Sequence, residues 1–551
     1  MIMKTHSILL AFILLCACSL HAQSAIQWQK TFGGSKQDAA YAMQQTPDGG
    51  YLVTGFSNSN DDDFTDHHGT TTYPDMIVLK LDSTGAVQWK HSLGGSNTDR
   101  GGCLAFAHGG GYLVAGASAS NDGDVTDHIG AAGVNNGWIV WLDENGTTIR
   151  TKSYGGGVSE DILRIVPTGD GGYVFAARSL SDKGEVTGHH GDTITSDYWV
   201  VKIDSIGNII WEKSLGGKGF DAPFGLALTD DSAFVLTGDS NSSDSTTKDG
   251  DVSGNHGLND IWTVKINDTG KIIWENSFGS SYDEDQNSIA LASDGGYLIG
   301  GSSYGKGGNI TVHYGHNDEY DIWVYKLARD GTLLWQKTLG GTGRDYEQDI
   351  HATSNGGCLV SGYSTSNDID VSGHHGDTTN YDAWVVQLDS LGNIEWEKSL
   401  GGTAMDGASG IVPTSDGGAI FAGNTQSTDG DLQYTSRGNN RNEDCWIVKL
   451  TPYKNASSVD EMPIVANAFD LFPNPARSGA TLQLEQNVKS DNAYAVITDI
   501  LGNVRMKIHL NPGDATQHIS FDVSQLSSGT YFASVIDSGM RMTVKILNVM
   551  K

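Results

Sequence analysis

Residues 349–400, DIHATSNGGCLVSGYSTSNDIDVSGHHGDTTNYDAWVVQLDSLGNIEWEKSL, contain four short runs of strand-forming residues separated by turns and one long polar loop. The first run, 349–353, alternates in polarity and ends at a glycine turn, because glycine readily adopts positive φ. The later runs are 358–362, 383–388 and 394–400, and they are rich in β-branched and aromatic residues. Four consecutive strands joined in this way predict one blade of a β-propeller.

The same pattern recurs along most of the chain with a period of about 61 residues. The fourth run of a unit carries a tryptophan at Trp28, Trp89, Trp211, Trp274, Trp335 and Trp396. The interval between Trp89 and Trp211 spans two periods, and Arg150 occupies the slot between them. The array therefore contains seven units, and a fixed period is the mark of a repeat fold.

The two ends of the array predict a closed ring. Residues 26–31 carry the pattern of a fourth run ahead of the first unit, and the last unit stops after its third run, 446–450. The N-terminal strand can complete the last blade, which removes an exposed sheet edge. A solenoid would instead need capping repeats. The sequence therefore predicts an all-β fold, a seven-bladed propeller of four-stranded blades over residues 23–452, closed by the N-terminal strand.

The N-terminus has the pattern of an export signal. Lys4 precedes the apolar run 8–15, and Leu20-His21-Ala22 forms a cleavage site, which predicts a signal peptide over residues 1–22. The apolar run is too short to cross a membrane, and no other segment is long enough, so we expect no membrane span. The three cysteines outside the signal peptide, Cys103, Cys358 and Cys445, are far apart in the sequence. We therefore expect them to be small buried side chains and not a disulfide framework.

The formal net charge of −32 constrains the partners of the protein. Phosphate recognition needs clustered Lys and Arg, so we expect no nucleic-acid partner. Cations are better candidates, although a high negative charge also serves solubility alone.

The repeat layout has architectural counterparts in known propellers. The glycine-ended second run 51–55, the third run 199–203 and Trp211 resemble the layout of kelch propellers. The turn 204–211 is similar to the tryptophan-docking turn of quinoprotein propellers, one residue shorter. Neither resemblance implies an activity, because such folds host many functions.

The period stops after residue 452, and the tail has a different pattern. Residues 453–466 have the composition of a linker, and 467–551 contain the short runs of a small Ig-like β-sandwich. The stretches 471–476 (LFPNPA), 499–503 (DILGN), 526–531 (LSSGTY) and 542–547 (MTVKIL) follow one another there. In this order they resemble the type A C-terminal sorting domain of the type IX secretion system. The resemblance implies that the type IX machinery is a partner and that the protein is secreted or held at the outer-membrane surface.

Two sets of polar residues recur in the propeller units. The first lies just after the fourth run, at Asp38, Asp99, Glu160, Asp221, Glu284, Asp345 and Asp406. The second lies just before the third run, at Asp75, Asn136, Asp197, Asp260, Asp321, Asp382 and Asp444. A catalytic group is needed once, whereas a turn needs its hydrogen bonds in every unit, so repetition favours a structural role.

Closely spaced aspartates in the long loops are candidate calcium ligands, because Ca²⁺ prefers carboxylate and carbonyl oxygens. The pairs are Asp122 with Asp124, Asp249 with Asp251, and Asp368 with Asp370; Asp61 with Asp63 and Asp429 with Asp431 have the same spacing. Histidines also recur in these loops, and there loop packing is favoured over metal binding. A stabilising calcium site and simple loop capping both remain open at the aspartates.

No nucleophile elbow, zincin motif, P-loop or dinucleotide fingerprint occurs in the sequence. The leading hypothesis is a non-catalytic binding protein that recognises a glycan or a protein through its acidic loop face. The alternative is a secreted polysaccharide-degrading enzyme, a glycosidase or lyase, that uses acids of the same face. Arg437 and Arg441 are unusual cations in one of the divergent loops and would serve that alternative. A component of a surface assembly is a third possibility.

Overall fold

The computed structural model describes residues 24–243, 250–316, 319–432, 442–453, 469–484, 493–498, 504–510, 517–537 and 540–550. The predicted signal peptide, 1–22, and nearly all of the predicted linker, 453–466, lie outside these ranges. The chain divides into two compact units, Gln23–Tyr453 and Lys454–Lys551. Every regular element in the described ranges is a β-strand, so the all-β prediction is confirmed.

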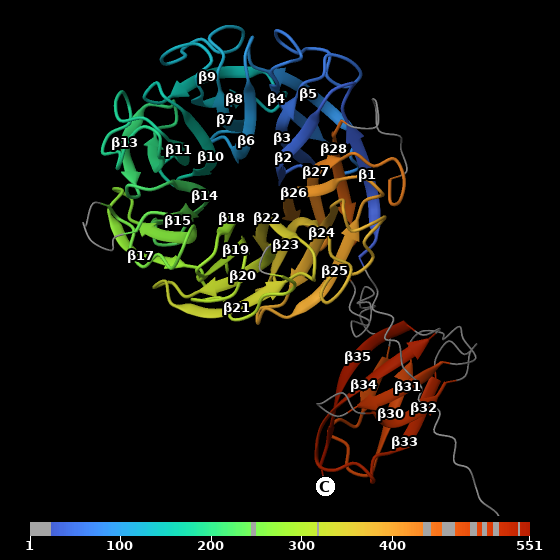
Figure 1. The fold of residues 1–551 in the computed structure, drawn as a ribbon. Helices are drawn as coiled ribbons and strands as arrows, with labels where there is room; N and C mark the ends of the chain where they lie inside the picture. The colour runs from blue at the N-terminus through green and yellow to red at the C-terminus, as the bar shows by residue number, and fades with distance from the viewer. Residues whose placement is uncertain are drawn as a thin grey trace, which may run out of the picture. The chain divides into compact units, whose positions relative to one another are not determined.

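The first unit is a β-propeller, in which seven four-stranded antiparallel sheets surround a central axis (Figure 1). We call each sheet a blade and number the blades in chain order. The first strand of each blade lies nearest the axis. The strands of the first four blades are β2 (Asp38–Gln45), β3 (Tyr51–Ser57), β4 (Asp75–Leu81), β5 (Val87–Leu93); β6 (Asp99–Phe106), β7 (Tyr112–Ser118), β8 (Asn136–Leu142), β9 (Thr148–Tyr154); β10 (Glu160–Pro167), β11 (Tyr173–Ser179), β12 (Asp197–Ile203), β13 (Ile209–Leu215); and β14 (Asp221–Leu228), β15 (Phe234–Ser240), β16 (Asp260–Ile266), β17 (Ile272–Phe278). Those of the last three are β18 (Glu284–Leu291), β19 (Tyr297–Ser303), β20 (Asp321–Leu327), β21 (Leu333–Leu339); β22 (Asp345–Ala352), β23 (Cys358–Ser364), β24 (Asp382–Leu388), β25 (Ile394–Leu400); and β26 (Asp406–Pro413), β27 (Ala419–Thr425), β28 (Asp444–Leu450) with β1 (Ile26–Phe32).

The ring closes through its two ends, as the sequence predicts. Strand β1 pairs antiparallel with β28, with Ile26 opposite Leu450 and Phe32 opposite Cys445. The N-terminal strand thus becomes the outer strand of the seventh blade. This pairing removes the free edge that β28 would otherwise present to solvent.

The position of a strand in its blade explains its sequence pattern. Strands β20 and β24 lie between two partners in their sheets, and nearly every residue in them is buried. Such strands are near-continuous apolar runs. In the outer strand β25, only Trp396 and the last two residues, Ser399 and Leu400, are buried, which matches its alternation of apolar and charged residues.

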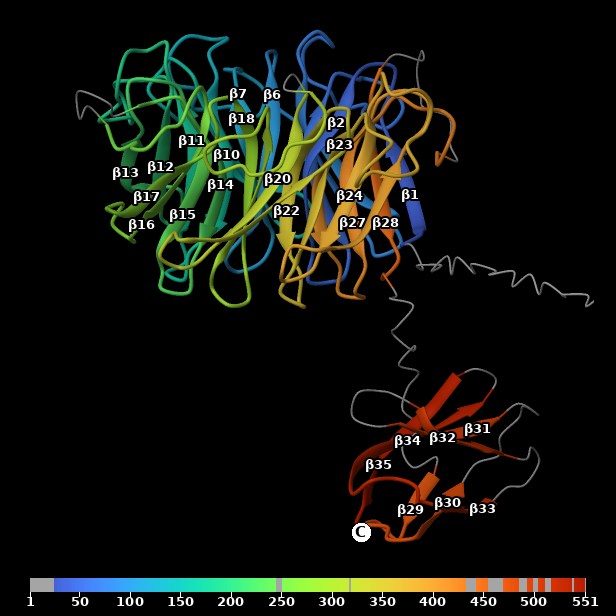
Figure 2. The same ribbon diagram turned by 60° about the horizontal axis from the view of Figure 1, so that its bottom comes forward.

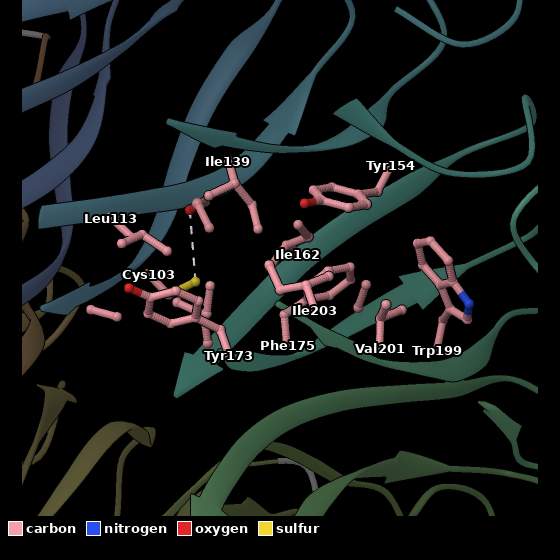
Figure 3. Packing of buried hydrophobic residues seen from close by; sticks show 14 of the residues in the cluster. Cys103, Leu113, Ile139, Tyr154, Ile162, Tyr173, Phe175, Trp199, Val201 and Ile203 are labelled. Carbon is pink, nitrogen blue, oxygen red and sulfur yellow. Dashed lines mark hydrogen bonds between the residues drawn. The ribbon is translucent and has the colours of Figure 1, made fainter. Parts of the chain in front are cut away.

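Neighbouring blades pack against each other through shared apolar cores. Between the second and third blades, Cys103, Ile139, Phe175 and Trp199 belong to one such cluster (Figure 3). The Phe175 and Trp199 rings meet edge to face with centroids 5.6 Å apart, a favourable aromatic geometry. Cys103 is a buried free thiol in this cluster, which confirms the expectation from its sequence context.

The fourth-strand residues Trp89, Trp211 and Trp274 each donate a hydrogen bond from Nε1 to the following blade. Trp211 donates from Nε1 to the Asp268 carbonyl at 2.8 Å, in the β16–β17 turn of the following blade. A Cβ at Gly270 in that turn would lie 3.3 Å from the Trp211 ring, so glycine allows the close approach. Arg150 fills the tryptophan slot of the second blade and donates to the Ser205 and Ile206 carbonyls at 3.0 and 3.1 Å.

The second unit is a small β-sandwich whose two sheets share one apolar core. Its Ig-like topology stays a prediction. One sheet contains β29 (Phe469–Phe472), β30 (Gly479–Leu484) and β33 (Gln517–Asp522); the other contains β32 (Val504–His509), β31 (Tyr494–Thr498), β34 (Gly529–Asp537) and β35 (Met540–Val549). Among the described residues, no helix is long and apolar enough to cross a membrane.

Candidate functional site on the loop face

The long loops between second and third strands gather on one side of the propeller (Figure 2). The short loops between successive blades meet them there, because Ser96 N donates to Asp122 Oδ1 at 2.7 Å and Thr342 N donates to Asp368 Oδ1 at 2.8 Å. We call this side the loop face. It is the acidic face on which the sequence analysis placed recognition.

The first acid set forms a ring of buried carboxyl groups, each at the first residue of a first strand. In the sixth blade, Asp345 accepts hydrogen bonds from Gly341 N at 2.8 Å and Ser366 Oγ at 2.9 Å, and from the Ser364 hydroxyl. Burial raises the pKa of Asp345 to about 7 and the pKa of Glu284 to about 8. All seven side chains are at most 2% exposed, which keeps them from a ligand in solution. Their contacts support the structural interpretation.

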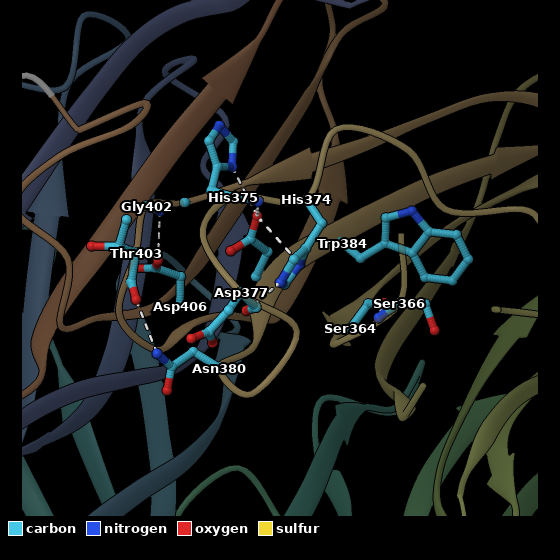
Figure 4. Close-up of polar contacts among 12 residues, drawn as sticks. Ser364, Ser366, His374, His375, Asp377, Asn380, Trp384, Gly402, Thr403 and Asp406 are labelled. Atoms are coloured by element: carbon cyan, nitrogen blue, oxygen red, sulfur yellow. Dashed lines mark hydrogen bonds and ion pairs between the residues drawn. The ribbon is translucent and has the colours of Figure 1, made fainter. Parts of the chain in front are cut away.

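The second set lies beside the first and binds the long loops. Asp382 Oδ2 accepts hydrogen bonds from both His375 N and His375 Nδ1 at 2.8 Å. Figure 4 shows His374 and His375 of this loop. Burial raises the pKa of Asp382, and the His375 hydrogen bonds oppose that rise. The ring of His374 lies close by, with Nδ1 at 3.7 Å from the same oxygen.

One glycine separates the two carboxyl sets at the boundary between blades. A Cβ at Gly340 would lie 2.4 Å from Asp345 Oδ2 and 3.0 Å from Asp321 Oδ1. The glycine therefore allows two buried carboxyl groups of neighbouring blades to approach each other. Burial is the main cause of the raised pKa of Asp345, and the negative charge of Asp321 adds to it.

The candidate calcium ligands make contacts between loops. Asp124 Oδ2 accepts Gly94 N at 3.1 Å, Asp251 Oδ2 accepts Gly216 N at 3.4 Å, and Asp370 Oδ2 lies 3.8 Å from Lys337 Nζ. Asp122 and Asp368 accept the backbone N–H groups named above, and Asp249 lies outside the described residues. Within the described ranges, no group of three or more His, Cys, Asp or Glu side chains is arranged to hold a metal ion. Calcium at these aspartates stays a prediction.

A cluster of tyrosines, which the sequence analysis did not identify, lies on the loop face across the fifth and sixth blades. It consists of Tyr304, Tyr320, Tyr346, Tyr363 and Tyr381, and each side chain is half-buried. Adjacent ring centroids are 4.6 Å apart for Tyr304 and Tyr320, 4.9 Å for Tyr320 and Tyr346, 5.1 Å for Tyr346 and Tyr363, and 4.9 Å for Tyr363 and Tyr381. We call these five residues the tyrosine cluster.

The tyrosine cluster departs from the sevenfold repeat. The slot of Tyr346, the second residue of the first strand, contains Ala39, Arg100, Asp161, Ala222, Asp285 and Gly407 in the other blades. Strand pairing places Tyr346 directly opposite Tyr363. These tyrosines could have been found in the sequence by aligning the seven units and looking for positions at which one unit differs from the others.

A cavity of about 450 Å³ adjoins the cluster, and Tyr381 belongs to both. Its lining also contains Glu319, Arg344, Asn367 and Asp368, together with hydroxyl side chains. Arg344 Nε donates to Glu319 Oε2 across this cavity. The result is a polar hollow with one aromatic side chain, Tyr381, in its lining.

A second cavity of about 460 Å³ lies among the first strands of the propeller. Tyr41, Phe224, Arg164, Asp349 and His351 are part of its lining. Asp349 Oδ2 accepts Ile411 N at 3.1 Å and lies 3.8 Å from His351 Nε2. This carboxylate is thus held by the neighbouring blade. Arg437 and Arg441, the cations named for the enzyme alternative, lie outside the described residues.

The C-terminal sandwich holds its first motif against its last strand. Asn474 Oδ1 accepts Asn548 N at 2.8 Å, and Ala476 N donates to the Asn548 carbonyl at 2.8 Å. Tyr531 Oη donates to the Ser527 carbonyl at 3.1 Å within the 526–531 motif. The 499–503 motif lies outside the described residues.

Comparison with known proteins identifies this second unit. Residues 470–549 match the secretion system C-terminal sorting domain. None of the curated proteins matches the chain. The protein is thus an exported β-propeller with a type IX sorting domain. Such a domain indicates secretion or a location at the outer-membrane surface, and it implies interaction with the type IX machinery.

Solved structures similar to this chain are propellers of diverse proteins. They include the Neurospora crassa Pan2 WD40 domain, with 9% identity over 77% of this chain and 97% of that one and a TM-score of 0.40. A gluconolactonase from Xanthomonas campestris, XC5397, has 10% identity over 78% and 95% and a TM-score of 0.31. A Synechocystis apocarotenoid oxygenase mutant has 12% identity over 70% and 96% and a TM-score of 0.34.

Proposed function

We propose that this protein is a non-catalytic binding protein of the cell exterior, which recognises a glycan or a protein through its loop face. The observation that carries this proposal is the break in the repeat on that face. The acids of the two recurring sets accept hydrogen bonds from their own chain, whereas the tyrosine cluster and its cavity lie on the fifth and sixth blades. Aromatic side chains around a few polar groups are the usual lining of a binding site.

The contacts of the buried acids lend less support to the alternative, a polysaccharide-degrading glycosidase or lyase. A general acid must reach the leaving oxygen of its substrate. Asp345 and Glu284 have raised pKa values, yet both are fully buried behind their serine partners. An acid in this position supports the frame of the blade and has no access to a polysaccharide.

Arrays of glycans and of surface or extracellular proteins test the proposal. The full chain, labelled on an exposed lysine, should bind at least one member of either array, both with calcium and with EDTA. A large ligand bound there should protect the 365–381 loop from proteolysis. Absence of binding on both arrays, or binding with no protection of the loops, would contradict the proposal. Release of reducing ends from any polysaccharide in the set would favour the enzyme alternative instead.

A further inference from the structure

We infer that the tyrosine cluster and the adjoining cavity bind the sugar rings of a neutral polysaccharide. This inference rests on the proposed function and assigns its ligand class and its site. The cluster gives a row of aromatic rings with neighbouring centroids 4.6–5.1 Å apart, running from the fifth blade into the sixth. A row of this kind suits an extended chain of repeating rings, because the C–H face of a sugar packs on an aromatic ring.

The lining of the cavity suits hydroxyl groups. Besides Tyr381 it contains several short polar side chains that donate and accept hydrogen bonds, which is what sugar hydroxyls require. They are Thr342, Thr365, Ser366, Asn367, Thr378 and Thr379. Tyr381 contacts both Tyr346 and Tyr363, with centroids 6.0 and 4.9 Å apart, so a chain can extend from the cavity onto the cluster.

The charged groups at the site are already paired within the protein. Arg344 donates to Glu319, Tyr320 Oη donates to Asp285 Oδ2 at 2.6 Å, and Asp368 accepts the Thr342 N–H and hydroxyl at 2.8 Å. An acidic ligand would have to compete with Glu319 for Arg344. The net charge of −32 also repels an acidic polysaccharide. The site therefore favours an uncharged polysaccharide over an acidic one.

The test measures binding of the full chain by affinity electrophoresis and calorimetry. The probes are four neutral polysaccharides (xylan, mannan, laminarin and hydroxyethylcellulose), one acidic polysaccharide (alginate) and one basic peptide (polylysine). The expected result is binding to at least one neutral probe and none to alginate. The double variant Tyr346→Ala/Tyr381→Ala should weaken that binding at least tenfold. Tyr73→Ala, at an exposed loop-face tyrosine in the first blade, is the matched control and should leave affinity unchanged.

A second variant guards against a folding defect. Thr378 is exposed and lines the cavity, so Thr378→Lys should fill the hollow without disturbing the core and should also weaken binding at least tenfold. Equal affinity of wild type and Thr378→Lys for the neutral probe would overturn the inference. Binding of alginate, polylysine or an arrayed protein alone would overturn it too, while leaving the proposed function in place. If the protein bound no member of the arrays and none of the probes, both the inference and the proposed function would be contradicted.

Discussion

The second and sixth blades have the same four-strand frame but differ on the loop face. In the sixth blade, the backbone N–H of His375 and its ring N–H at Nδ1 both donate hydrogen bonds to Asp382 Oδ2. In the second blade, the corresponding residues are Ile129 and Asn136, and Ile129 N donates to Asn136 Oδ1 at 2.7 Å. The backbone hydrogen bond is retained while the imidazole and the carboxylate are lost together. The frame therefore needs an acceptor at this position and does not need a charge.

The same two blades differ in their aromatic content. The slots of Tyr346, Tyr363 and Tyr381 contain Arg100, Ala117 and Asn135 in the second blade. Both blades nevertheless complete four-stranded sheets in the ring. Residues that recur in all blades thus maintain the fold, and residues that depart from the repeat are available for recognition.

The largest effect is expected where the frame itself is broken. Asp345→Ala removes the acceptor of Gly341 N and of two serine hydroxyls in the sixth blade. Three buried donors without partners should lower the free energy of unfolding by about 3 kcal/mol or more. Denaturant unfolding followed by circular dichroism measures this loss. The control is Asp368→Ala on the exposed loop of the same blade, and an equal loss in both variants would contradict the role of the buried ring.

The ring of buried carboxyl groups should also make the stability of the protein depend on pH. Burial places the pKa of Asp345 at about 7 and that of Glu284 at about 8, above the values of 3.8 and 4.5 for free side chains. The folded state therefore favours the protonated carboxyl groups, and this contribution is lost as pH rises from about 4 to about 8. The hydrogen bond to Asp197 raises the pKa of His190, which acts in the same direction.

Thermal unfolding at pH 5 and pH 9 measures this dependence. We expect a Tm several degrees lower at pH 9, and a smaller difference in Asp345→Asn, which has no ionisable group at that position. A Tm that rises between pH 5 and pH 9 would contradict the sign of the effect. Asp231 does not contribute in this window, since the hydrogen bond from Lys265 lowers its pKa to about 2.

A smaller loss of stability is expected when two residues of the sixth blade are replaced by their counterparts in the second blade. His375→Ile with Asp382→Asn should cost less than about 1 kcal/mol, because the backbone hydrogen bond seen at Asn136 can form again. Asp382→Ala instead leaves the His375 N–H without its acceptor and should cost about 1–3 kcal/mol. Denaturation of the two variants side by side gives the comparison. Equal losses would show that the charge, and not the acceptor, supports the blade.

The smallest effect is expected from calcium at the closely spaced aspartates. Asp122 and Asp368 already accept backbone N–H groups, so an ion would gain few unoccupied oxygens. Weak binding to the folded state should raise the Tm by about 1–2 °C in millimolar calcium relative to EDTA. The double variant Asp368→Asn/Asp370→Asn should reduce the rise. An unchanged Tm in wild type would remove the calcium prediction.

The strands were readable from the sequence because each blade repeats the same local pattern. The predicted run 394–400 coincides with β25, Ile394–Leu400, whereas the run beginning at 349 belongs to β22, which starts at Asp345. The earlier start was missed because Asp345 is a buried polar residue, which the apolar alternation cannot reveal.

The candidate site was less predictable because it depends on contacts between loops and between blades. Asp122 and Asp124 are two residues apart, yet their carboxylates accept from Ser96 and Gly94 of the preceding loop. Local spacing cannot anticipate those partners. The tyrosine cluster joins Tyr304 with Tyr381, residues far apart in the sequence, through rings on two blades. Such a cluster becomes visible only once the blades are placed side by side.

A crystal structure of the full chain with an oligosaccharide of the tightest-binding probe tests the central claim most directly. The claim is that the repeated acids maintain the propeller while the tyrosine cluster recognises the ligand. The account predicts sugar rings against Tyr346 and Tyr381, with the Asp345 and Asp382 hydrogen bonds unchanged. Sugar bound among the first strands beside Tyr41 and His351, or held by the buried acids, would contradict it.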